Sequence, residues 1–281
     1  MSRFSSPDDW DETIKSPGAV SERGYRRTLA PWSMGWPNPA SFTHIAVDYR
    51  DRHDARVTGS GENGVVAHPI NRAPELLVGF DTETTGLDVR CERAISYGFC
   101  IYRYGQPVEI EEFFVVPDRP ISDGARRVHG LDVERLNTMR STHVVLDVAA
   151  GARRAIEVLT RYHEAGAYVV GANVVRFDLA MLRHTANDVL EGDNAASTFE
   201  QTNFRIIDVI EHDLVIDPSR VFRPRRSLSH LCSHYNVKPG DHDAVGDARA
   251  AVEVLLEQIV HNNAGQRELS ILPPDHPVKG A

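Results

Sequence analysis

The sequence is poor in cysteine. It holds three cysteines among 281 residues, Cys91, Cys100 and Cys232, and no two of them form a Cys-x-x-Cys pair. This spacing argues against a zinc site built on thiolates and against a disulfide framework. The scarcity fits a reducing compartment, so we expect a cytoplasmic protein.

The sequence also lacks long apolar runs and an excess of positive charge. No segment reaches the roughly 18 apolar residues that a membrane-spanning helix needs, and the opening MSRFSSPDDWDET lacks the apolar core of a secretory signal. We therefore expect no membrane partner. The formal net charge is −9, whereas proteins that coat nucleic acid non-specifically are usually basic. An acidic enzyme that grips a few phosphates through metal ions stays compatible with this charge.

Residues 1–74 have little periodic hydrophobicity. Seven prolines and the stretch GSGENG interrupt them, and only Ser41–Asp51 has the pattern of a strand. This composition predicts a flexible or loosely docked N-terminal extension. All three tryptophans, Trp10, Trp32 and Trp36, lie in it. Because aromatic anchors are typical of docking segments, the extension is a candidate for binding a polymerase or another protein.

From residue 75 onward, apolar strands and amphipathic helices follow one another. The expected strands are Leu76–Asp81, Ala94–Tyr104, Val108–Val116, Ala167–Asn173 and Phe204–Ile210. The expected helices are roughly Asp147–Ala165, a segment starting at Phe177, the segment after an N-cap at Ser227, and Asp243–Val260. This order predicts an α/β domain, with a mixed sheet and helices on its faces, over residues 75–264. Residues 265–281 are expected to form a C-terminal tail.

The first strand ends in two acids, in the stretch LLVGFDTETTGLD. Asp81 and Glu83 are two residues apart, so in a strand both side chains point to the same face. Two like charges at one place raise the free energy unless a positive charge lies between them. Asp178 and Asp247 stand at the starts of two expected helices. Carboxylates without cysteines or several histidines favour magnesium or manganese.

Each of these acids also has an ordinary structural explanation. Asp81 and Glu83 are compatible with a solvated strand end, Asp178 with a helix cap and Asp247 with a helix surface. His242, five residues before Asp247, is compatible with a surface loop. If that loop directly precedes the last helix, with Asp243 near the cap, the imidazole can accept a proton from an attacking water.

Three segments together resemble a known family. FDTETTGL and HDAVGD are similar to the first and third motifs of the DnaQ-like, DEDDh-type 3′–5′ exonucleases, the family of the proofreading epsilon subunit, ribonuclease T and oligoribonuclease. GANVVRFDLAML resembles the second motif, although Ala172 replaces the usual histidine and one extra residue separates Asn173 from Phe177. VHGLDVERL resembles a further family segment. The resemblance covers Glu75 to Asn262.

The resemblance implies a ribonuclease H-like fold with a mixed five-stranded sheet. It implies that two divalent ions, Mg²⁺ or Mn²⁺, are held by four acids, Asp81, Glu83, Asp178 and Asp247, and that His242 is the general base. It also implies contacts with the end of the substrate, through the Thr84 backbone, Leu87, His129 and Asn173.

The leading hypothesis is a metal-dependent 3′–5′ exonuclease that releases nucleoside monophosphates from single-stranded ends, with DNA preferred, in proofreading or repair. One alternative is RNA trimming of the ribonuclease T or oligoribonuclease type, because both substrates share the phosphodiester that the motifs act on. Another is a partner-docking module with a vestigial nuclease domain. In a third, the N-terminal extension is the main functional element of the protein and the nuclease domain is secondary.

A basic segment, RVFRPRR, lies before the expected helix at Ser227. Its arginines, Arg220, Arg223, Arg225 and Arg226, are candidates for phosphate contacts or for a solvated loop. Asp208, in the stretch IIDVI, is expected to be structural.

Overall fold

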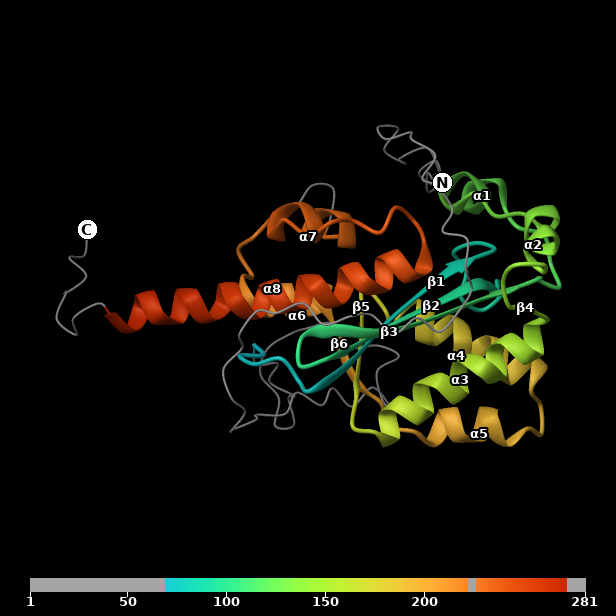
Figure 1. Cartoon of the computed structure of the whole chain (residues 1–281), viewed down its shortest axis with the longest axis horizontal. Helices are drawn as coiled ribbons and strands as arrows, with labels where there is room; N and C mark the ends of the chain where they lie inside the picture. Colours follow the sequence, from blue (N-terminus) through green and yellow to red (C-terminus); the bar gives the residue numbers. More distant parts are fainter. Residues whose placement is uncertain (1–68, 222–225, 272–281) are drawn as a thin grey trace, which may run out of the picture.

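The computed structural model describes residues 69–221 and 226–271. Its central element is one six-stranded sheet (Figure 1). The strand order is β4-β3-β2-β1-β5-β6. The strands are β1 (Leu76–Thr84), β2 (Ala94–Arg103), β3 (Gln106–Val115), β4 (Val145–Leu146), β5 (Tyr168–Gly171) and β6 (Arg205–Asp208). The resemblance implied five strands, and the sixth is the two-residue β4 at the sheet edge. The three tryptophans lie outside the described residues.

The sheet is mixed. β1, β2 and β3 form an antiparallel meander, whereas β5 pairs parallel with β1 and β6, and β4 pairs parallel with β3. The prediction of a mixed sheet with helices on its faces is therefore confirmed. The predicted strand Phe204–Ile210 is too long, because Asp208 accepts a hydrogen bond from the Ile210 N–H and thereby begins a helix.

Eight helices accompany the sheet in the described part of the chain. They are α1 (Asp123–His129), α2 (Val133–Met139), α3 (Val148–Glu164), α4 (Asp178–Val189), α5 (Asn194–Gln201), α6 (Val209–Ile216), α7 (Leu228–Tyr235) and α8 (Ala244–Ile271). Ser227 caps α7, as predicted, and Asp147, predicted as the first residue of its helix, is the N-cap of α3. The backbone of α8 runs past the predicted end at Val260. None of the described helices has the length and apolar character needed to cross a membrane.

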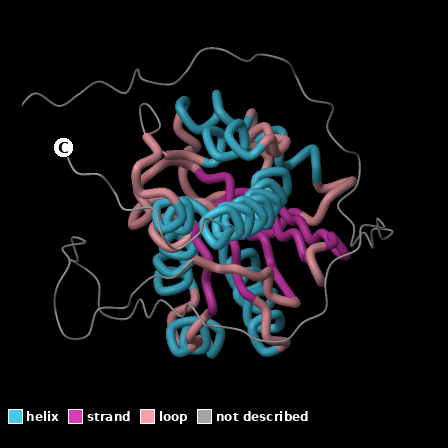
Figure 2. Tube along the Cα trace, turned by 90° about the vertical axis from the view of Figure 1, so that its left-hand side faces the viewer, coloured by secondary structure: helices cyan, strands magenta, loops and turns pink. Residues whose placement is uncertain are grey.

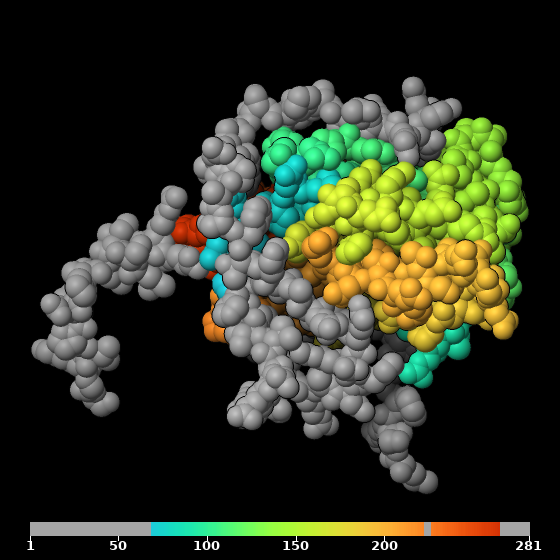
Figure 3. Space-filling model, turned by 90° about the horizontal axis from the view of Figure 1, so that it is seen from below, coloured from blue at the N-terminus to red at the C-terminus, as the bar shows by residue number. Residues whose placement is uncertain are grey.

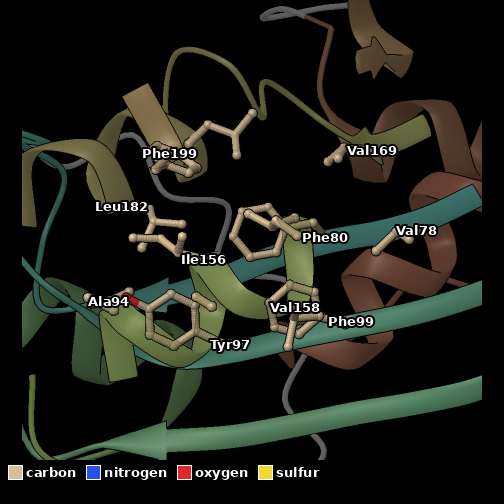
Figure 4. Close-up of a cluster of buried hydrophobic side chains, with 14 of the residues drawn as sticks. Val78, Phe80, Ala94, Tyr97, Phe99, Ile156, Val158, Val169, Leu182 and Phe199 are labelled. Atoms are coloured by element: carbon tan, nitrogen blue, oxygen red, sulfur yellow. The ribbon is translucent and has the colours of Figure 1, made fainter. Parts of the chain in front are cut away.

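Two apolar cores lie on opposite faces of the sheet (Figures 1 and 2). On one face, Phe80 and Phe99 stack with ring centroids 5.0 Å apart, under α3, α4 and α5 (Figure 4). Figure 3 shows this side, where α3 and α5 form a continuous surface in yellow-green and orange. On the other face, Leu77 and Leu255 belong to a core closed by α6, α7 and α8. The apolar residues of β1 therefore alternate between two buried faces.

Glycines on β1 and β2 let α8 lie directly on the sheet. A Cβ at Gly79 would overlap the carbonyl of Ala248, and a Cβ at Gly98 would overlap the backbone of Ala244. A side chain at either position would push the helix away. This close approach brings the first turn of α8, which carries Asp247, to the end of β1.

The residues that precede β1 pack along α6 and α8. The Ile70 N–H donates to His212 Nε2 at 3.0 Å, and Ile70 and Ala73 contact the apolar core under α8. Asn71 accepts hydrogen bonds from Asn262 and Asn263. This segment therefore forms part of the folded surface around the helix.

Candidate active site

The end of β1 carries a compact group of acids. Asp81 lies opposite Gly98 and Glu83 opposite Ser96 in the β1–β2 ladder, so both point to the face covered by α8. One carboxylate oxygen each from Asp81, Glu83 and Asp247 lies within 4.8 Å of the others. The structure thus brings together three of the four acids selected from the sequence. We call Asp81, Glu83, Asp178 and Asp247 the acid cluster.

Asp178 joins the cluster from another direction. It is the first residue of α4, is 2% exposed, and accepts a hydrogen bond from Thr82 Oγ1 at 2.6 Å. Burial is the largest cause that raises the pKa of Asp81 and of Glu83, and the negative charge of Asp178 adds to it. Thr82 was not selected from the sequence. Its position between the two acids of β1 is the only signal that pointed to it.

The cluster holds more negative charge than its surroundings offset. Burial, followed by the charges of the neighbouring acids, raises the pKa of Asp81 and of Glu83 well above their usual values. Burial also raises the pKa of Asp178 to about 7 and that of Asp247 to about 6. Among the described residues, no lysine or arginine forms an ion pair with any of the four.

The donor set fits a hard divalent cation. Its ligand atoms are all carboxylate oxygens, and three of them already converge. Hard cations such as Mg²⁺ and Mn²⁺ prefer oxygen ligands, and their charge would stabilise the ionised form of acids whose pKa is otherwise raised. The cluster therefore has the chemistry of a divalent metal site.

His242 lies on the loop directly before α8, as predicted. Asp241 and His242 both have left-handed backbones, with φ of 59° and 57°, and the His242 residue is exposed. The Asp247 N–H donates to the Asp243 carbonyl at 2.8 Å, which places Asp247 in the first turn. Burial raises the pKa of Asp247, and the charge of His242 partly offsets this effect. Left-handed non-glycine residues cost of order 1–3 kcal/mol and concentrate at functional sites.

His129 is held in one tautomer. Its Nδ1 accepts a hydrogen bond from the Leu131 N–H at 3.0 Å, so the proton lies on Nε2, which donates to the Thr84 carbonyl at 3.1 Å. Burial lowers the pKa of His129. The neutral imidazole thus fixes the backbone of Thr84 at the end of β1.

Leu87 projects from a firmly anchored loop. Leu87 is 69% exposed, which is high for a large apolar side chain. The Thr85 N–H donates to the Arg93 carbonyl at 2.8 Å, and the Arg93 N–H donates to Thr85 Oγ1 at 2.9 Å. Arg93 is 1% exposed and forms ion pairs with Asp118 and Asp188. The sequence analysis missed this arginine, because its acidic partners are distant in the chain.

Asn173 lies in the turn between β5 and α4. Its backbone is left-handed, with φ of 60°, and its N–H donates to Asp208 Oδ1 at 3.1 Å. Asp208 also caps α6, so its expected structural role is confirmed. The residue Asn173 is exposed, at the same end of the sheet as the start of α4.

Two of the four arginines in the basic segment are structural. Arg220 and Arg226 both form ion pairs with Asp213, which is fully buried, and their own side chains are 17% and 10% exposed. A guanidinium committed to a buried carboxylate is not a free phosphate contact, so the phosphate-binding interpretation is wrong for these two. Arg223 and Arg225 lie outside the described residues.

The sequence itself matches a family model. The model of the RNase T family, described as Exonuclease, matches residues 78–255, which is more than half of the chain and includes the whole acid cluster and His242. The chain belongs to the DnaQ-like 3′–5′ exonuclease family. No curated protein matches the sequence significantly.

Solved structures of E. coli exonuclease I share the fold of this exonuclease domain. The complex with a dT13 oligonucleotide has 19% sequence identity and a TM-score of 0.53, over 70% of this chain and 43% of that one. A zinc-bound complex with single-stranded DNA has 18% identity and a TM-score of 0.52, over 70% and 43%. A complex of ExoI with SSB-Ct has 18% identity and a TM-score of 0.53, over the same shares. The chain thus spans less than half of these proteins, and the predicted ribonuclease H-like fold is confirmed.

Proposed function

We propose that this protein is a metal-dependent 3′–5′ exonuclease that removes nucleoside monophosphates from single-stranded nucleic acid ends, with DNA preferred. The observation that carries the proposal is the acid cluster at the end of β1, where three carboxylates converge without a basic partner among the described residues. The preference for DNA is supported by the structural likeness to exonuclease I, which was solved with DNA oligonucleotides.

The four acids would hold two divalent ions, Mg²⁺ or Mn²⁺. When bound, such ions supply charge that stabilises the transition state of phosphodiester hydrolysis. Asp81 and Glu83 contribute from one strand face, Asp247 from the first turn of α8 and Asp178 from the start of α4. Three separate elements therefore fix the ligands, which restricts the geometry that an ion can adopt.

His242 is proposed as the general base. It accepts a proton from the attacking water; the water oxygen bonds to phosphorus, and the bond from phosphorus to the 3′ oxygen of the preceding nucleotide breaks. The shortened strand keeps a 3′-hydroxyl, and a nucleoside monophosphate leaves. The loop position of His242 suits this role, because an exposed imidazole can exchange its proton with solvent between cycles.

The residues around the end of β1 are proposed to bind the terminal nucleotide. The Thr84 backbone, fixed by His129, would meet the terminal 3′-hydroxyl, and the exposed Leu87 would pack against the terminal base. His129 and Asn173 would lie beside the last nucleotides. We also propose a role in proofreading or repair and a cytoplasmic location. Residues 1–74 are proposed to dock a polymerase or another protein.

The experiment compares 5′-labelled single-stranded DNA and RNA of equal sequence. We expect the DNA to shorten from its 3′ end, one nucleotide at a time, with Mg²⁺ or Mn²⁺ and not with EDTA. A strand with a blocked 3′ end is the control and should resist. Faster loss of RNA would favour the RNA-trimming alternative, and intact substrates under every condition would favour a vestigial nuclease domain.

A further inference from the structure

Thr82 stands between the two acids of β1 but faces the other way. Because side chains alternate along a strand, Thr82 points to the face opposite that of Asp81 and Glu83. It is 6% exposed, and its hydroxyl donates to Asp178 Oδ1 at 2.6 Å. The hydrogen bond is thus enclosed by protein, and it joins the strand that carries two acids to the helix that carries a third.

The pairing of β1 with β5 ends before Thr82, the residue that contacts Asp178. The parallel pairing of β1 with β5 ends at Gly79 and Val170, whereas β1 itself continues to Thr84. Beyond that point, the edge of β1 that faced β5 has no strand partner among the described residues. The Thr82 hydroxyl therefore holds one oxygen of the Asp178 carboxylate beside this part of β1.

We propose that Thr82 is a positioning residue that orients the Asp178 carboxylate toward the cation held by the acid cluster. This inference rests on the proposed function. Groups that hydrogen-bond to a metal ligand fix its orientation, and their loss typically lowers metal affinity by about 10–100-fold. Asp178 lies outside the set of three oxygens that already converge, and the Thr82 hydroxyl donates a hydrogen bond to its carboxylate.

The test replaces the hydroxyl with a methyl group of nearly the same size. Thr82→Val should weaken Mn²⁺ binding, measured by calorimetry, by about 10–100-fold. It should raise the Mn²⁺ concentration needed for half-maximal cleavage, with a smaller effect on the rate at saturating metal. Thr82→Ser, which keeps the hydroxyl, should recover most of the affinity that Thr82→Val loses.

Thr185→Val is the matched control. Thr185 is 1% exposed on α4, the helix of Asp178, and its buried hydroxyl has no hydrogen-bond partner among the described residues. The same change there should leave Mn²⁺ affinity as in the native protein.

Two outcomes would overturn the inference: native affinity in Thr82→Val, or equal losses in Thr82→Ser and Thr82→Val, because the hydroxyl would then not be the cause. Native protein that binds Mn²⁺ but cleaves no nucleic acid would contradict the proposed function and leave the comparison of affinities valid. Native protein that binds no Mn²⁺ would contradict both.

Discussion

Two regions of this protein bury carboxylates in opposite ways. Asp213 on α6 is fully buried and meets the guanidinium groups of Arg220 and Arg226 and the hydroxyl of Tyr235, which donates at 2.7 Å. The acid cluster at the end of β1 holds one buried carboxylate, Asp178, and three partly buried ones, and none of the four has an arginine or lysine partner among the described residues. The same residue type is therefore structural where the protein supplies its counter-charge, and a candidate cation site where it does not.

Glu111 is a second buried acid whose charge is compensated. It is 4% exposed on β3 and accepts hydrogen bonds at 3.0 Å from both Arg154 and Arg161 of α3. The acid cluster has no such arginine at any of its four positions among the described residues, and these positions lie on elements that converge. Bringing like charges together away from water raises the free energy of the folded protein.

The largest expected effect comes from removing one charge of the acid cluster. Asp81→Asn should lower cleavage by about a thousandfold or more, since metal effects are worth several kcal/mol and each 1.36 kcal/mol is tenfold in rate. The melting temperature without metal should stay the same or rise, because the change relieves repulsion among like charges. Single-turnover rates and thermal melts check both parts. Retained cleavage would contradict the assignment of the acid cluster as a catalytic metal site.

The next largest effect distinguishes a general base from a metal ligand at His242. His242→Ala should lower turnover by about 10²–10⁴-fold, the usual span for general acid–base catalysis, with Mn²⁺ affinity little changed. His184→Ala, at an exposed histidine on α4, is the control and should behave as the native protein. Full turnover in His242→Ala, or a collapse of Mn²⁺ affinity along with the rate, would contradict the proposed role.

Removing the compensated acid should affect stability instead. Asp213→Ala leaves two guanidinium groups without their buried partner and should lower the free energy of unfolding by about 3–5 kcal/mol. Asp123→Ala, whose side chain is 79% exposed in its pair with Arg126, should change it by less than about 1 kcal/mol. Chemical denaturation measures both. A small loss of unfolding free energy in Asp213→Ala would show that the ion pairs of Asp213 contribute less to stability than the burial of Asp213 implies.

A smaller effect concerns pH. The pKa of Asp178 rises from its ordinary 3.8 to about 7, so the folded state binds protons more tightly than the unfolded state does. Asp178 should therefore make the metal-free protein lose stability as the pH rises from about 4 to about 7. Melting curves of native protein and Asp178→Asn should diverge across this window without metal, and Mn²⁺ should raise the stability of the native protein at its upper end. Parallel curves would contradict the raised pKa.

Local signals predicted the elements that carry them. The apolar runs of β1 and β2, the amphipathic pattern of α3 and the N-cap at Ser227 all depend on neighbours in the sequence, and the structure has each of these elements. The short β4 has no such signal, because two residues are too few for a pattern. The end of the β6 strand was misplaced because the capping bond of Asp208 competes with an apolar run that looks like strand.

The site was predicted as far as its residue types and motifs allow. Acids two apart on a strand end must share a face, which is why Asp81 and Glu83 could be selected before the structure was known. Thr82 and Arg93 could not, since their partners Asp178 and Asp188 are distant in sequence and a threonine or arginine is common in any loop. The ion pairs of Arg220 and Arg226 could not be predicted either, and both residues were candidates for phosphate contacts or for a solvated loop, because Asp213 becomes their partner only in the fold.

The central claim is that the acid cluster, which has no lysine or arginine partner among the described residues, binds cations. Calorimetric titration of Mn²⁺ into native protein and into Asp81→Asn tests it most directly. The account predicts saturable binding of two ions to the native protein and a loss of most of that binding in Asp81→Asn, with the variant still folded. Equal binding by both proteins, or none by the native protein, would contradict it.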